Sequence, residues 1–144
     1  TWMTREDRLS DIEDNVEYLD ALHAHVLASL GGASPTFTAL GFSQGVATVA
    51  RWLERTSVHV DRALLWGSTI PADVDLAASS ALRAARLTSI AGSADEHATP
   101  DMLASQDVRL TTNGIAYERV SFNGSHRIDR DVLGRLAADG VPAR

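Results

Sequence analysis

Short apolar segments of β-forming residues alternate with helical segments along this chain, and this alternation constrains its fold more than any other feature. The first such segment, residues 36–42, carries no charge, as expected for a strand that is buried on both faces of a sheet. Further strands are predicted over residues 59–66, 86–91 and 115–122. Strands that alternate with helices form parallel sheets covered by those helices. We therefore predict an α/β fold with a mostly parallel sheet of about four strands.

The spacing of apolar residues predicts the helices that flank these strands. The stretch Ser10-Asp11-Ile12-Glu13 has the form of a capping box, which predicts that the first helix begins at Ser10. This helix should end at Gly31-Gly32. Later helices are predicted from about 44 to 55, from 100 to 111, and behind a cap at Asp129. One apolar face of the first helix, with spacings of three and four, comprises Ile12, Val16, Leu19, Leu22, Val26 and Leu30.

Length, charge and composition exclude several classes of function. A chain of 144 residues predicts one domain over residues 1–144. Its net charge of −6 argues against a protein that binds nucleic acid, which needs a basic face. The absence of cysteine excludes disulfides, thiolate metal ligands and cysteine nucleophiles. Because the sequence shows neither a signal peptide nor a long apolar run, we expect a cytoplasmic protein that does not enter membranes.

The segment Gly41-Phe42-Ser43-Gln44-Gly45 fits the pattern G-x-S-x-G between a predicted strand and a predicted helix. This context indicates a nucleophile elbow, a tight turn that holds a serine hydroxyl above the carboxyl end of the sheet. We expect a strained backbone at Ser43, and we expect both glycines to avoid collisions with neighbouring backbone. The backbone N–H of Gln44 opens the following helix and can face a developing oxyanion. Ser43 is therefore the predicted nucleophile, and Gln44 is the predicted oxyanion donor.

A serine nucleophile needs a general base and an acid that orients the base, and both have candidates after later strands. In this kind of fold the chain order is serine, acid, histidine. Asp95 follows the third predicted strand and His126 follows the fourth. Both positions, like that of Ser43, lie at carboxyl ends of strands, where parallel sheets bind ligands. Glu96 and Asp101 are alternative partners for the histidine.

Four segments spread over most of the chain resemble the phospholipase/carboxylesterase family of α/β-hydrolases. That family includes short-chain carboxylesterases, lysophospholipases and acyl-protein thioesterases. The resemblance runs from about Asp11 to Ala137. Its motifs are Gly41-Phe42-Ser43-Gln44-Gly45, Leu64-Leu65-Trp66-Gly67-Ser68 followed by Ile70-Pro71, Ala91-Gly92-Ser93-Ala94-Asp95 with Pro100, and Gly124-Ser125-His126.

The resemblance implies a site and a reaction. Ser43 would be the nucleophile, Asp95 the triad acid and His126 the general base. The expected activity is hydrolysis of small or short-acyl carboxylic esters through an acyl-enzyme, without a cofactor or a metal. Thioesterase or lysophospholipase activity is the alternative within this class. Trp66 and Ile70 would bind the acyl group, with packing in the core as the other interpretation.

One departure from the family concerns the sequence before the elbow. Family members usually have several strands there, with a His-Gly loop that donates the second oxyanion N–H. Here about one helix precedes the elbow strand, so we expect a reduced α/β-hydrolase fold without the usual N-terminal strands. The elbow strand would then have an unpaired apolar edge, which proteins normally cover. The chain could be a fragment, form a homodimer over that edge, or cover it with residues around Trp2. A non-catalytic half-fold that serves assembly is the alternative function.

Overall fold

Four parallel strands form one sheet within residues 7–139, the range that the computed structural model describes. The strands are β1 (Thr38–Phe42), β2 (Arg62–Trp66), β3 (Arg86–Gly92) and β4 (Tyr117–Phe122), and they lie in this order across the sheet. The helices are α1 (Arg8–Ser29), α2 (Gln44–Arg55), α3 (Ser80–Ala84), α4 (Pro100–Thr112) and α5 (Arg130–Ala138). Each connection between neighbouring strands contains a helix, as parallel strands require. The predicted α/β fold is confirmed.

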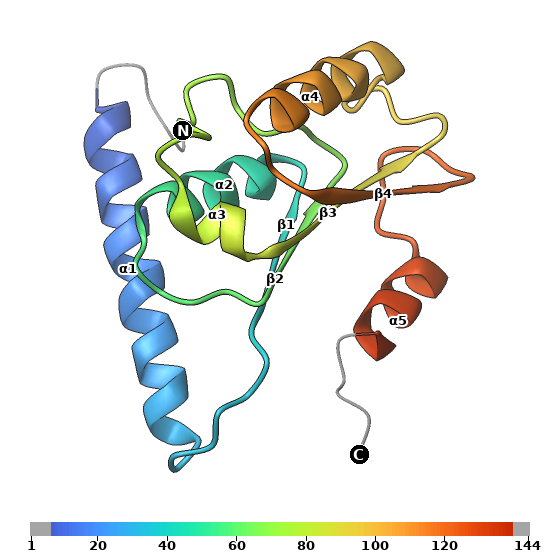
Figure 1. Ribbon diagram of the computed structural model, residues 1–144. Coiled ribbons are helices and arrows are strands. Elements are labelled where there is room, and N and C mark those ends of the chain that lie inside the picture. Colours follow the sequence, from blue (N-terminus) through green and yellow to red (C-terminus); the bar gives the residue numbers. More distant parts are fainter. Residues whose placement is uncertain (1–6, 140–144) are drawn as a thin grey trace.

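Strand β2 shows how the sheet is buried on both faces. All five of its residues are buried. Ala63 and Leu65 belong to the hydrophobic core beneath α2, whereas Leu64 and Trp66 belong to a second core beneath α5. This alternation follows from the pleat, which points successive side chains to opposite faces. Figure 1 shows the same layers, with α1, α2 and α3 on one side of the sheet and α5 on the other.

Helix α1 begins earlier than the sequence predicts. Its first residue is Arg8 and its N-cap is Asp7, so the prediction of a start at Ser10 is wrong. Arg8 forms an ion pair with Asp73, and Asp73 also pairs with Arg51 of α2 at 3.1 Å. These contacts connect the first turn of α1 to Asp73 and, through Asp73, to α2.

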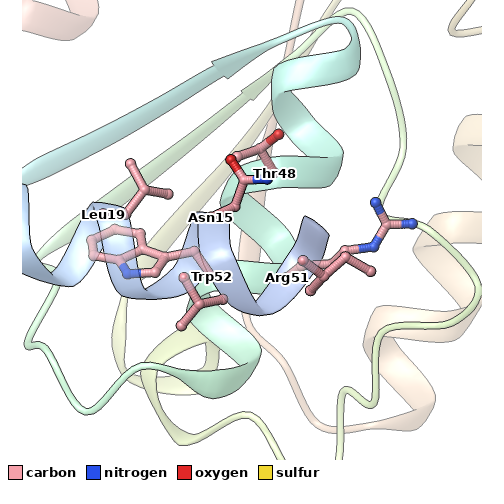
Figure 2. Close-up of a pocket in the computed structure, with 7 residues that line it drawn as sticks. Asn15, Leu19, Thr48, Arg51 and Trp52 are labelled. Atoms are coloured by element: carbon pink, nitrogen blue, oxygen red, sulfur yellow. The ribbon is translucent and has the colours of Figure 1, made fainter. Parts of the chain in front are cut away.

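The first half of α1 packs on α2, where Figure 2 shows Leu19 and Trp52 among the residues at the contact. The indole N–H of Trp52 donates to Asp20 at 2.7 Å, and the hydroxyl of Thr56 donates to the same oxygen at 2.6 Å. The cavity left between the helices is about 10 Å³, roughly the space of one water. This contact therefore anchors α1 and leaves no room for a substrate.

The second half of the predicted apolar face of α1 is exposed. Leu22, Val26 and Leu30 are 43%, 44% and 43% exposed, and Leu40 of β1 is 39% exposed. Leu22, Val26 and Leu40 line a groove of about 230 Å³ between α1 and β1, an edge strand of the sheet. Trp2, one predicted cover for this edge, lies outside the described residues. Within residues 7–139, no helix is long and apolar enough to cross a membrane.

Candidate active site

Ser43 occupies the turn between β1 and α2 in a strained backbone conformation. Its φ is 54° and its ψ is −119°, and no other non-glycine residue within residues 7–139 has a positive φ. Such a conformation costs about 1–3 kcal/mol and persists only where the surroundings enforce it. The N–H of Ser43 donates to the carbonyl of Trp66 at 2.8 Å, which ties the turn to β2. The hydroxyl makes no capping bond to α2 and so stays available for another partner.

The two glycines of the elbow differ in what they contribute. A Cβ on Gly41 would lie 2.5 Å from the carbonyl oxygen of Gly45, closer than any side chain allows. A Cβ on Gly45 would meet no described atom within 4 Å outside its own helix backbone. The expectation that both glycines avoid backbone collisions is therefore wrong for Gly45. Only Gly41 is crowded, because the carbonyl group of Gly45 lies against it at the end of β1.

The structure brings Ser43, His126 and Asp95 together into one chain of hydrogen bonds. Nε2 of His126 lies 2.8 Å from Oγ of Ser43. Nδ1 of the same ring lies 3.0 Å from each carboxylate oxygen of Asp95. The Asp95 side chain is 1% exposed and the imidazole is 23% exposed. The acid is thus shielded, while the ring keeps access to solvent. Glu96 and Asp101, the alternative acids, are exposed and make no described contact with the histidine.

The loop after β3 presents Asp95 to the imidazole. One carboxylate oxygen accepts the N–H groups of His97 at 2.8 Å and Ala98 at 3.2 Å. A Cβ on Gly92 would lie 2.3 Å from the carbonyl oxygen of Gly124, so glycine lets this loop approach the loop that carries the histidine. Both the acid and the base are therefore held by the packing of two neighbouring loops.

The hydrogen-bond partners assign the proton positions on His126. An ionised carboxylate only accepts hydrogen bonds, so Nδ1 carries the proton that Asp95 binds. Nε2 is then unprotonated and accepts the hydrogen of the Ser43 hydroxyl. In this tautomer the imidazole can remove the serine proton when the oxygen attacks an electrophile.

Two aromatic rings contact His126 that sequence reasoning did not assign to the site. The ring of Phe42 stacks on the imidazole at 4.8 Å with an interplanar angle of 28°. The ring of His97 meets it edge-on at 4.5 Å and 64°. Phe42 precedes Ser43 and His97 lies two positions after Asp95, so proximity to motif residues was the available signal. These rings restrict the movement of the imidazole.

Gln44 is the first residue of α2, so its backbone N–H lies in the first turn, where N–H groups have no acceptor within the helix. It directly follows Ser43, and the positive end of the helix dipole lies here. Charge that develops beside the serine oxygen would therefore meet a donor group. Within residues 7–139, no group of three or more histidine, cysteine or acidic side chains is arranged to hold a metal ion.

Trp66 and Ile70, the predicted substrate-binding residues, are buried in the hydrophobic core. Trp66 is 0% exposed, its ring packs near Phe122, and its indole N–H donates to the carbonyl of Arg127 at 2.9 Å. Ile70 lies in the core on the α2 side, and its N–H donates to the side chain of Gln106 at 2.7 Å. Both side chains pack in the hydrophobic core of this structure, as the other interpretation of these residues expects.

Comparison with solved structures finds the same fold in several proteins, among them an esterase and a carboxylesterase. The chain superposes on Arabidopsis thaliana SOBER1 with a TM-score of 0.72 at 16% identity, covering 90% of this chain and 62% of that one. Esterase PE8 superposes with a TM-score of 0.71 at 25% identity, covering 92% of this chain and 61% of that one. A carboxylesterase from Mesorhizobium loti superposes with a TM-score of 0.71 at 21% identity, covering 92% of this chain and 63% of that one. No protein-family model and no curated protein matches the chain.

These likenesses confirm the predicted class at the level of the fold. The chain has the α/β-hydrolase fold in the form that these three structures share. It spans somewhat over 60% of their length: 62% of SOBER1, 61% of PE8 and 63% of the Mesorhizobium loti enzyme.

Proposed function

We propose that this protein is a serine hydrolase that cleaves small or short-acyl carboxylic esters. The observation that carries the proposal is the continuous hydrogen-bond chain from Ser43 through His126 to Asp95. A serine hydroxyl is a weak nucleophile by itself, and an oriented imidazole is the group that activates it. The likeness in fold to carboxylesterases supports the choice of an ester as substrate.

In the first step an acyl-enzyme forms. Oγ of Ser43 attacks the ester carbonyl carbon while its proton passes to Nε2 of His126. Asp95 stabilises the imidazolium through Nδ1, and the N–H of Gln44 donates to the carbonyl oxygen as it becomes an oxyanion. Collapse of this intermediate breaks the bond to the alcohol, which leaves with the proton from Nε2.

In the second step water releases the acid by the same route. A water molecule gives one proton to Nε2 as its oxygen attacks the acyl carbon. The bond from that carbon to Oγ of Ser43 then breaks, and the serine recovers the proton from His126. Hydrolysis of the acyl-enzyme needs no cofactor or metal in this mechanism.

The serine variant tests the proposal directly. Wild-type protein should hydrolyse p-nitrophenyl acetate and butyrate, and Ser43→Ala should lose roughly 10⁶-fold in kcat, as comparable serine nucleophiles do. A fluorophosphonate probe should label the wild type at Ser43 and leave the variant unlabelled. Ser93→Ala, at an exposed serine in the loop before Asp95, is the matched control and should keep full turnover. Turnover that survives Ser43→Ala would disprove the proposal.

A second candidate function is assembly without catalysis. The exposed apolar groove between α1 and the edge strand β1 is the observation that favours it. In this case a second copy would cover the groove, and the wild type would show neither ester turnover nor fluorophosphonate labelling. The same two assays therefore separate the candidates.

A further inference from the structure

We propose that Gly67 is a positioning residue of the triad, because its lack of a side chain provides the space in which the imidazole of His126 and the carboxylate of Asp95 meet. This inference rests on the proposed function for its effect on turnover. The close approach of Gly67 to His126 and Asp95 is observed in the structure and does not depend on that function. Gly67 belongs to none of the three catalytic positions and lies directly after strand β2.

The order of the strands explains why the residue at this position has no side chain. Ser43 follows β1 and Asp95 follows β3, and β2 lies between these two strands. His126 comes from beyond β4, so its ring can bridge the acid and the serine only by crossing the carboxyl end of β2. Gly67 is the residue that follows this end, and its N–H donates to the carbonyl of Ile90 on β3 at 2.8 Å. This bond holds the Gly67 backbone beneath the ring.

A side chain at this position would press on both members of the pair. A Cβ on Gly67 would lie 3.0 Å from Cε1 and 3.1 Å from Nδ1 of His126, and 3.3 Å from Oδ2 of Asp95. These separations are tighter than nine in ten real Cβ contacts, so a neighbour must shift by a few tenths of an ångström. Relief requires the imidazole to move, which would lengthen its hydrogen bonds to Ser43 and Asp95. Phe42, stacked on the same ring at 4.8 Å, limits how far it can move.

The backbone of Gly67 has a φ of +69°, so any substitution also introduces strain that is unrelated to the triad. Gly114 provides a matched control, since its φ is +64°. A Cβ there would meet only Nη1 of Arg83, at 3.8 Å, an ordinary contact with the end of a flexible side chain. Gly67→Ala and Gly114→Ala therefore share the backbone strain, and they differ in whether the new methyl group reaches the imidazole.

The experiment compares these two variants in turnover of p-nitrophenyl acetate and in the proton NMR spectrum. We expect Gly67→Ala to lose about 10²-fold or more in kcat with little change in KM, since small misplacements of a catalytic group have effects of this size. The far-downfield resonance of the Nδ1–H of His126, which reports the bond to Asp95, should shift or disappear. Gly114→Ala should keep the kcat and the resonance of the wild type. Equal losses in the two variants, or an unchanged resonance in Gly67→Ala, would overturn the inference.

A double-mutant cycle in urea unfolding covers the case in which Gly67→Ala folds poorly. If the methyl group collides with the imidazole, the loss of stability from Gly67→Ala should shrink in a His126→Ala background. The loss from Gly114→Ala should be the same in both backgrounds, and a Gly67→Ala loss that is equally insensitive to residue 126 would count against the inference. The NMR and unfolding measurements need no ester turnover. A wild type without esterase activity would therefore disprove the proposed function while these measurements still decide the role of Gly67.

Discussion

Nε2 of His126 lies 2.8 Å from Oγ of Ser43, although 83 positions separate the two residues in the chain. The bond joins the loop after β4 to the turn after β1, which are the two outer strands of the sheet. Strands β2 and β3 lie between them, so this contact depends on the register of all three parallel pairings. The candidate site is therefore a property of the whole sheet.

Asp95→Asn should lower kcat for p-nitrophenyl acetate by about 10⁴-fold, as the same substitution does in another serine triad. The asparagine oxygen can still accept the N–H groups of His97 and Ala98, which the carboxylate binds at 2.8 and 3.2 Å, so the loop should keep its conformation. Its amide nitrogen, however, donates toward Nδ1 of His126. The imidazole proton then moves to Nε2, and no lone pair remains for Ser43.

Glu96→Gln is the control for that substitution, because Glu96 is exposed and adjacent to Asp95. We expect its kcat to equal that of the wild type. A comparable loss in the two variants would show that the acid of the site had been assigned to the wrong residue.

Alanine substitutions at the two elbow glycines should have opposite outcomes. Gly41→Ala places a methyl group 2.5 Å from the carbonyl of Gly45, so the turn must shift and both stability and turnover should fall. Gly45→Ala meets no described atom of another element within 4 Å and should raise the free energy of unfolding by up to about 1 kcal/mol, since alanine is the better helix former. Urea unfolding and ester turnover measure both effects. A Gly45→Ala variant that is less stable than the wild type would contradict the conclusion that a side chain at position 45 meets no neighbour.

Stability should depend on pH through Asp61, which accepts the N–H of Phe37 at 2.7 Å beside the start of β1. That backbone hydrogen bond is the main reason that the pKa of Asp61 lies below its ordinary value of 3.8. A lowered pKa in the folded state stabilises the protein above pH 3.8, and this contribution disappears as the pH falls through the folded pKa.

Asp61→Asn should therefore destabilise the protein at pH 7 and should matter less as the pH drops below 3.8. The effect should be at most about 1 kcal/mol, because the side chain is 37% exposed and water screens its interactions. Urea unfolding of both proteins between pH 3 and pH 7 checks this. A difference that stays constant over that range would refute the role of the ionised carboxylate.

The exposed edge of β1 predicts a homodimer in solution. Leu40 is 39% exposed beside the groove between α1 and β1, and a charged residue on an edge strand opposes pairing with another chain. Light scattering should report a dimer for the wild type and a monomer for Leu40→Lys. A wild type that stays monomeric across micromolar concentrations would contradict this prediction.

Some features of the structure could not be predicted from local sequence. Helix α1 begins at Arg8, ahead of the capping signal at Ser10, and Arg8 pairs with Asp73, which lies 65 positions away in the chain. The capping signal at Ser10 gives no information about this partner. Trp66 follows two leucines in a strand, and only the packing of α5 and β4 shows that its ring lies in the hydrophobic core. Gly67 stands out only once the neighbouring strands are in place.

The alternation of strands and helices could be predicted from the amino-acid sequence, because helices and strands follow from apolar spacing and turn residues within a few positions. The elbow motif around Ser43, and the order in which Asp95 and His126 follow it, are also visible in the sequence. The folded structure was needed to show that these three side chains lie within hydrogen-bond distance and that an exposed groove lies between α1 and β1. Those relationships depend on the order and register of four strands, which bring together residues that no local interaction connects.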